Sequence, residues 1–254
     1  MGLFGKLFEK KECSICGAEI GLLGNRKLKD GNMCTGCANK LSPWFQDRWQ
    51  STVDEILEQL DYREENQKKV EVFEATRILG QKTKVYLDED KMQFIIADGK
   101  NFKENNPDVL DFSQVTGVDL DTRHTRSEEK RQTPGGDYVS YNPPRYTHSY
   151  DFDVIIHVNH PYFEEMRFQL NNHTVRIEDS GRRGLFSSNG PTDHPDYLEY
   201  AEMGHEIKQA LTEARQMSRK AAAPKQAVTC PWCGATTKPD ASGCCEYCGG
   251  SVNG

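Results

Sequence analysis

Eight of the nine cysteines in this 254-residue chain fall into Cys-x2-Cys pairs, and two pairs lie near each end of the sequence. The N-terminal group consists of Cys13, Cys16, Cys34 and Cys37, and the C-terminal group of Cys230, Cys233, Cys245 and Cys248. Four thiolates complete the tetrahedral coordination of Zn2+ and leave no open position, which is the arrangement of a structural site. The pattern therefore predicts two structural zinc ions per chain.

Disulfides or redox-active Cys-x2-Cys pairs are the alternative interpretation. The chain has no thioredoxin-like βαβ pattern around either group, and paired quartets at both ends are hard to explain by redox chemistry. A module of about 30 residues around the N-terminal group would bury too little apolar surface to fold alone. The metal would then supply much of its folding free energy.

Three cysteines, Cys244, Cys245 and Cys248, compete for two positions of the C-terminal site. The sequence Cys245-Glu-Tyr-Cys248-Gly repeats the Cys-x-x-Cys-Gly pattern found after Cys13 and again after Cys230. Glycine tolerates the positive φ of a tight turn whose N–H groups point at sulfur. Because Cys244 would form a Cys-x3-Cys pair instead, we predict that Cys245 and Cys248 close a ribbon of two hairpins and that Cys244 is a spare.

The two halves of the N-terminal group predict different local structures. Cys16 is followed by Gly17, which suits a knuckle, whereas Cys37 is followed by Ala-Asn-Lys-Leu, which suits a helical turn. The dipole at a helix N-terminus favours thiolates. This pattern predicts the plan of a treble-clef finger.

Composition favours a cytoplasmic protein, with 28% charged and 36% hydrophobic residues. No apolar run approaches the roughly 20 residues of a membrane span, and the N-terminus lacks a signal-peptide core. The net charge of -7 is unevenly distributed along the chain. The first 41 residues hold seven Lys or Arg and four Asp or Glu, whereas residues 42–224 hold 23 Lys or Arg and 33 Asp or Glu. Since an acidic bulk repels phosphate backbones, nucleic-acid binding is the less favoured function.

Hydrophobic periodicity divides the chain into six segments. Residues 1–11 form a short amphipathic N-terminus, residues 12–43 the zinc module, and residues 44–79 a helical connector with a polar break or solvated face at 63–69. Residues 80–219 alternate as six or seven strands and end in an amphipathic helix. Residues 220–228 are a linker of small and basic residues, and residues 229–254 are the zinc ribbon.

Residues 121–149 interrupt the predicted strands. They are rich in Pro, Gly, Thr, Ser and charge, which predicts a long loop or an extended hairpin, and we favour a flexible insertion. The stretch also mixes arginines with Tyr138, Tyr141 and Tyr146, a combination used by nucleic-acid and peptide sites. Acidic residues in the same stretch keep its net charge small.

Other candidate chemistry is sparse. His157 and His160 would point to opposite faces of a strand, so we interpret them as ordinary strand or surface histidines. Arg182 and Arg183 lie between glycines and could bind a phosphate or carboxylate, but a solvated loop explains them equally well. The sequence contains no Gly-rich phosphate loop, G-x-S-x-G or H-E-x-x-H motif. We predict no catalytic residues and no enzymatic activity.

The N-terminal module, followed by KLSPWF at residues 40–45 and TVDEILEQLDYREEN at 52–66, resembles bacterial proteins with the zinc-finger-like domain of unknown function 4428. The resemblance implies a following domain similar to bacterial pleckstrin-homology-like domains, and the tail resembles the zinc ribbons of many prokaryotic proteins. The expected fold class is α+β, with a treble-clef-like module, a helical connector, a central antiparallel β-sandwich or barrel closed by a C-terminal helix, and a tethered zinc ribbon.

These features predict a non-enzymatic zinc-binding adaptor that contacts other proteins. One alternative is a weak membrane-surface contact through the amphipathic residues 1–11. Another is nucleic-acid binding through the zinc modules. The sequence carries no signal of oligomeric state.

Overall fold

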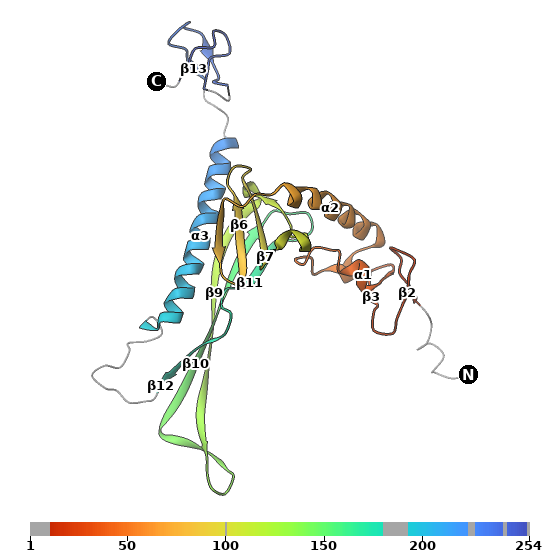
Figure 1. Ribbon diagram of the computed structural model, residues 1–254, viewed down its shortest axis with the longest axis vertical. Coiled ribbons are helices and arrows are strands. Elements are labelled where there is room, and N and C mark those ends of the chain that lie inside the picture. Colours follow the sequence, from red (N-terminus) through yellow and green to blue (C-terminus); the bar gives the residue numbers. More distant parts are fainter. Residues whose placement is uncertain (1–10, 100, 180–192, 223–226, 241–242, 253–254) are drawn as a thin grey trace. The chain divides into compact units, whose positions relative to one another are not determined.

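The computed structural model describes residues 11–99, 101–179, 193–222, 227–240 and 243–252 (Figure 1). The chain divides into two compact units, Met1–Arg215 and Gln216–Gly254. Arg182, Arg183 and all but the last residue of the predicted amphipathic N-terminus lie outside the described residues. No helix in the described ranges is long and apolar enough to cross a membrane.

The N-terminal zinc module consists of two short hairpins and a helix. Strand β1 (Lys11–Glu12) pairs with β2 (Glu19–Ile20), β3 (Arg26–Lys27) pairs with β4 (Asn32–Met33), and α1 spans Thr35–Ala38. Its small core contains Leu28, Met33 and Leu41 together with Cys13 and Cys37. Two of the predicted zinc ligands are therefore part of the hydrophobic interior.

The helical connector is one uninterrupted helix after a short 3-10 turn. The turn η2 covers Arg48–Gln50 and α2 covers Val53–Val72, where Thr52 and Glu55 form a capping box at the N-terminus. The predicted break at residues 63–69 is wrong, because the helix continues through them. The alternative prediction, a solvated face, holds for the stretch apart from the buried Arg63 and Asn66. The connector's last residues form a strand instead, β5 (Arg77–Gly80).

Buried polar side chains on one face of α2 explain why the helix is not broken here. Asp108 is fully buried, and its carboxylate accepts hydrogen bonds from Arg63 Nη1 at 2.8 Å, Tyr62 Oη at 3.0 Å and Ser42 Oγ at 2.8 Å. Burial and the neighbouring carboxylate raise the pKa of Tyr62, so its hydroxyl stays a donor. We call these four residues the Asp108 junction. It ties the zinc module and α2 to the central domain.

Asn66 extends this attachment by one helical turn. Its Nδ2 donates to the backbone oxygen of Pro107 at 2.8 Å, and its Oδ1 accepts from the N–H of Val109, also at 2.8 Å. The same Nδ2 donates to the side chain of Asn106 at 2.7 Å. Because both ends of the amide are used, Asn66 fixes the segment that leads into β8.

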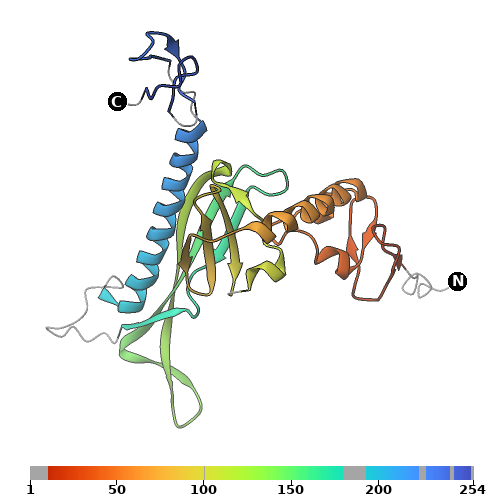
Figure 2. The same cartoon turned by 45° about the horizontal axis from the view of Figure 1, so that its top comes forward.

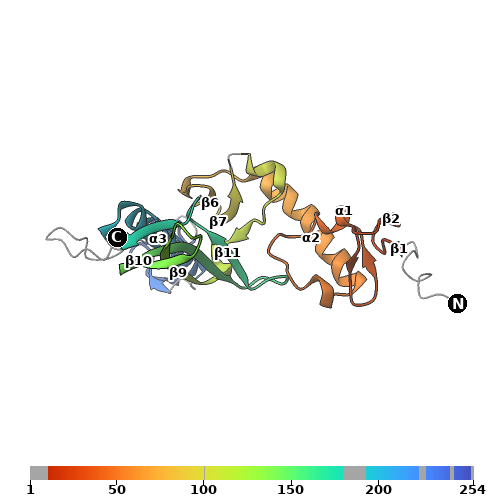
Figure 3. The same cartoon turned by 90° about the horizontal axis from the view of Figure 1, so that it is seen from below.

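The first sheet is antiparallel and is buried on both faces. It contains β5, β6 (Thr83–Asp88), β7 (Gln93–Asp98) and β8 (Leu110–Asp111) in that order, and the short helices η3 (Phe102–Asn105) and η4 (Phe112–Gln114) flank β8. Val85 and Leu87 face the main core, whereas Tyr86 packs with Val70 and Phe73 from the end of α2. Figure 3 shows α2 running from the zinc module to this sheet.

The second sheet is built around two long strands. Strand β10 (Tyr138–Val158) pairs with β9 (Val115–Gln132) on one edge, and with β11 (Glu165–Gln169) and β12 (Val175–Asp179) on the other. Residues 121–149 therefore belong to an extended hairpin, which was one of the two predicted alternatives, and not to a long loop (Figure 2). Its Pro143 and Pro144 lie where the register shifts between Ser140 and Arg145, a place where a strand tolerates proline.

Helix α3 (Pro195–Ala222) packs along the second sheet. Its buried Tyr200, Ile207 and Leu211 join one core with residues of both sheets, including Val154 and Phe94. Strands β5–β12 remain in two separate sheets and form no closed barrel within the described residues, so the barrel alternative is wrong. The α+β class, the antiparallel sheets and the closing helix are confirmed, while the similarity to pleckstrin-homology-like domains stays a prediction.

The C-terminal unit has little regular structure. Strand β13 (Val228–Thr229) pairs with β14 (Thr236–Thr237), and a single bridge joins Cys244 to Ser251. Its buried residues include Cys230, Cys245 and Thr237. As in the N-terminal module, two of the predicted zinc ligands are among the buried residues.

Candidate metal centres

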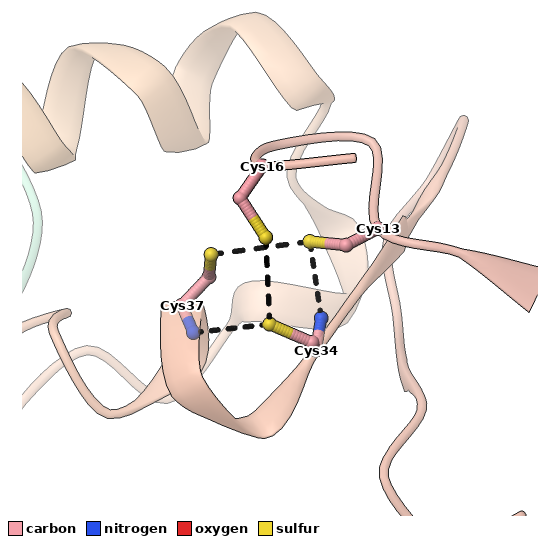
Figure 4. Close-up of side chains that lie close together, drawn as sticks. All are labelled: Cys13, Cys16, Cys34 and Cys37. Atoms are coloured by element: carbon pink, nitrogen blue, oxygen red, sulfur yellow. Dashed lines mark hydrogen bonds between the residues drawn. The ribbon is translucent and has the colours of Figure 1, made fainter. Parts of the chain in front are cut away.

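The N-terminal cysteines converge as the spacing predicts. The sulfur atoms of Cys13, Cys16, Cys34 and Cys37 all lie within 4.8 Å of one another (Figure 4). The Cys13–Cys37 sulfur distance is 3.9 Å and the Cys16–Cys34 distance is 3.8 Å. A tetrahedral zinc ion with Zn–S bonds of about 2.3 Å would hold its sulfur atoms about 3.8 Å apart. The four side chains therefore fit a Zn2+ ion.

Two different backbone structures position these sulfur atoms. Cys13 and Cys16 belong to a knuckle between β1 and β2, whereas Cys34 is the N-cap of α1 and Cys37 lies within that helix. The N–H of Cys34 donates to Cys13 Sγ at 3.3 Å, and the N–H of Cys37 donates to Cys34 Sγ at 3.4 Å. Such N–H groups stabilise thiolates, as predicted for a knuckle facing a helix N-terminus.

The pKa values of Cys13 and Cys37 are shifted in opposite directions. Burial raises the pKa of Cys13, but the backbone N–H groups of Cys34, Cys16 and Ile15 outweigh it and lower this pKa to about 6. Burial and hydrogen bonds with the other three thiols raise the pKa of Cys37. A divalent cation offsets the repulsion between thiolates, so metal binding here would ionise all four cysteines and release protons.

The C-terminal cysteines form a second group of the same kind. The sulfur atoms of Cys230, Cys233, Cys245 and Cys248 also lie within 4.8 Å of one another. The Cys230–Cys248 distance is 3.6 Å and the Cys233–Cys245 distance is 3.7 Å, again close to the tetrahedral value for zinc. Burial raises the pKa of Cys245, but the backbone N–H groups of Tyr247 and Cys248 lower it to about 6.

Three knuckles share one backbone pattern. In each, the first cysteine's N–H donates to the carbonyl five residues later, and the glycine's N–H donates back to that cysteine's carbonyl, with all six distances between 2.8 and 2.9 Å. The glycines Gly17, Gly234 and Gly249 have φ of 74°, 70° and 69°. This positive φ explains why glycine follows each pair. The knuckle that starts at Cys245 therefore matches the other two.

Cys244 lies outside the sulfur group. Its N–H donates to Asp240 Oδ1 at 2.8 Å, and it bridges to Ser251 across the ribbon. We expect the Cys244→Ser protein to keep two zinc ions per chain and the Cys245→Ser protein to lose the C-terminal ion. The reason is that Cys245 contributes a sulfur to the group and Cys244 does not. Native mass spectrometry of the intact protein measures both. A zinc loss caused by Cys244→Ser would contradict the assignment.

The remaining candidates do not form a comparable centre. His157 Nε2 lies 3.1 Å from Asp119 Oδ2, whereas His160 stacks on Phe163, so the two imidazoles have separate surroundings. Within the hairpin of residues 121–149, Arg126 lies 3.5 Å from the ring centroid of Tyr146 and Arg145 lies 4.3 Å from that of Tyr141. Within the described ranges, only the two cysteine groups bring three or more possible metal ligands together.

Exposed apolar residues lie near both groups, and the leucines of the N-terminal module were not singled out from the sequence. Leu22 and Leu23 are 82% and 93% exposed in the loop after β2. Trp232 and Tyr247 are 75% and 71% exposed and belong to the two C-terminal knuckles. The Gly-Leu-Leu-Gly sequence at 21–24 is a signal for the first pair, because two glycines around two leucines favour a turn rather than a buried strand.

A model of a domain of unknown function, DUF4428, matches residues 11–59. This match covers the N-terminal zinc module and the first turns of α2, as the sequence resemblance implied. No curated protein and no solved structure matches the chain. The comparisons therefore identify the N-terminal domain and carry no information about activity.

Proposed function

We propose that this protein is a non-enzymatic zinc-binding adaptor whose zinc-stabilised modules present surfaces to other proteins. Each cysteine group offers four sulfur ligands, so a bound zinc ion has no open position for substrate or water. Such zinc ions stabilise the fold of a small module and supply no Lewis-acid chemistry. The function then resides in the residues that the modules display.

The observation that carries the proposal is the aromatic pair of the C-terminal unit. Trp232 and Tyr247 occupy the same position in their two knuckles, immediately before the second cysteine. The N–H of Trp232 donates to Cys230 Sγ at 3.4 Å while its side chain is three-quarters exposed. In each knuckle, the backbone N–H of the aromatic residue donates a hydrogen bond to a cysteine sulfur, and the aromatic ring stays exposed.

The indole of Trp232 is also held in place. Its Nε1 donates to the carbonyl of Ser251 at 3.0 Å. A Cβ at Gly250 would lie 2.6 Å from the indole Cδ1, so only glycine lets the ring pack this closely over the backbone. An exposed but ordered tryptophan loses little conformational entropy on binding, which is the property of interface hot spots.

A quantitative pull-down with the intact protein tests this proposal. We expect Trp232→Ala with Tyr247→Ala to weaken capture of the specific partner on the order of 30-fold, the effect of truncating a hot spot. Trp49→Ala is the matched control, because Trp49 is also exposed, at 63%, but lies in the other unit. Equal capture by all three proteins would rule out the aromatic pair, provided that each variant retains two zinc ions.

A further inference from the structure

The loop between β2 and β3 exposes the two most accessible large hydrophobic side chains of the described residues. Leu22 and Leu23 are 82% and 93% exposed. Both stand outside the small core of the zinc module, which ends at Ile20 on one side of the loop and resumes at Leu28 on the other. These two adjacent leucines add nothing to the core of the module, so their apolar surface is available for an interaction.

Hydrogen bonds hold the loop in a fixed turn. The N–H of Gly24 donates to the carbonyl of Gly21 at 3.0 Å, and Thr35 Oγ1 from α1 donates to the carbonyl of Gly24 at 3.2 Å. Arg26 Nη1 donates to the carbonyl of Leu23 at 3.3 Å. The leucines are thus presented by a turn tied to the metal-bearing helix, and the backbone polar groups of the tip are partly satisfied within the module.

Positive charge lies close to the leucines. Arg26 contacts the loop directly, Lys27 follows it on β3, and Lys11 pairs with Ile20 at the end of β2 where the loop begins. Glu19 and its strand partner Glu12 are the acidic residues at this end of the hairpin. The first 41 residues as a whole hold seven basic and four acidic residues, against 23 and 33 in residues 42–224. An anionic surface would therefore attract this end of the chain and repel the middle.

We propose that the Leu22–Leu23 loop inserts into the interfacial layer of membranes that contain anionic lipids, with Lys11, Arg26 and Lys27 near the lipid headgroups. Leucine side chains gain free energy on leaving water, and nearby Lys and Arg add electrostatic attraction to an anionic leaflet. The leucines provide no aromatic stacking or hydrogen bonds for nucleic-acid bases, so the apolar tip favours lipid over nucleic acid. Two short side chains give reversible attachment.

The β1–β2 pairing adds a topological argument. Because Lys11 pairs with Ile20, the point where residues 1–10 join the module lies beside the start of the loop. Those residues include Leu3, Phe4, Leu7 and Phe8 in sequence and belong to the amphipathic segment for which the sequence offered membrane contact as an alternative function. The proposal concerns the loop alone, and the experiment separates the two contributions.

Vesicle co-sedimentation of the intact, zinc-loaded protein tests the loop. The probes are phosphatidylcholine vesicles with and without phosphatidylserine. We expect binding only when phosphatidylserine is present, and we expect Leu22→Ser with Leu23→Ser to reduce it at least about tenfold because two apolar side chains no longer leave water. Leu57→Ser with Leu198→Ser is the matched control, since these leucines are 42% and 40% exposed elsewhere, and it should bind as the unchanged protein does.

Two further variants complete the test. Arg26→Glu with Lys27→Glu should lower binding to the anionic vesicles, and the remaining binding should be less sensitive to salt. Absence of vesicle binding by the unchanged protein, or equal binding by the Leu22 and Leu23 variant, would overturn the proposal. So would binding that depends only on residues 1–10, measured with a variant lacking them. Loss of protein capture with intact vesicle binding would assign the loop to a protein partner instead.

Discussion

Removal of zinc from the N-terminal site is expected to unfold residues 12–43 while the central domain stays folded. The module has only a small core, in which Cys13 and Cys37 are 2% and 5% exposed among a few apolar side chains. Structural zinc contributes apparent binding free energies of about 10–16 kcal/mol in finger peptides, which is more than such a core supplies. The main core, in contrast, is built from two sheets and α3 and contains no cysteine of either group.

Hydrogen exchange on the intact protein measures this effect region by region. Cys37→Ser, or a zinc chelator, should remove the protection of amides in residues 12–43 and in the first turns of α2, where Ile56 belongs to the module's core. Cys233→Ser is the matched control, since it should remove protection only around the C-terminal group. Retained protection of residues 12–43 in the Cys37→Ser protein would show that the module folds without its metal.

The cysteine groups could be predicted because their geometry is encoded locally. A Cys-x-x-Cys-Gly knuckle needs only five residues to place two sulfur atoms and one positive φ, and the choice of Cys245 over Cys244 follows from the same short pattern.

The errors occurred where distant residues decide the structure. Arg63 and Asn66 look like solvated helix residues by composition, yet their partners lie about forty residues later, at 106–109. Residues 121–149 have the composition of a loop, but pairing between β9 and β10 starts at Val115 and Val158 in the core and continues outward as a ribbon. Closure of a barrel likewise depends on pairing between strands far apart in sequence, which no local pattern specifies.

A further large effect is expected at the Asp108 junction, where Asp108→Ala should lower the free energy of unfolding by about 3–5 kcal/mol. The substitution leaves the Arg63 guanidinium buried, with its side chain only 7% exposed, and without the carboxylate 2.8 Å away. An uncompensated buried charge costs far more than the ion pair itself contributes. Tyr62 and Ser42 also lose their acceptor. Urea denaturation of the zinc-saturated protein measures the change.

A double variant separates these causes. Arg63→Leu with Asp108→Leu removes both charges, so it should be much less destabilised than Asp108→Ala alone, because apolar side chains of adequate size can replace a buried ion pair. Lys68→Ala is the surface control, since the Lys68–Glu65 pair is exposed and its loss should leave stability unchanged. If Asp108→Ala were also neutral, the junction would hold no buried charge. The zinc module and the central domain would then be joined by the chain, by the hydrogen bonds of Asn66 and by apolar contacts of α2.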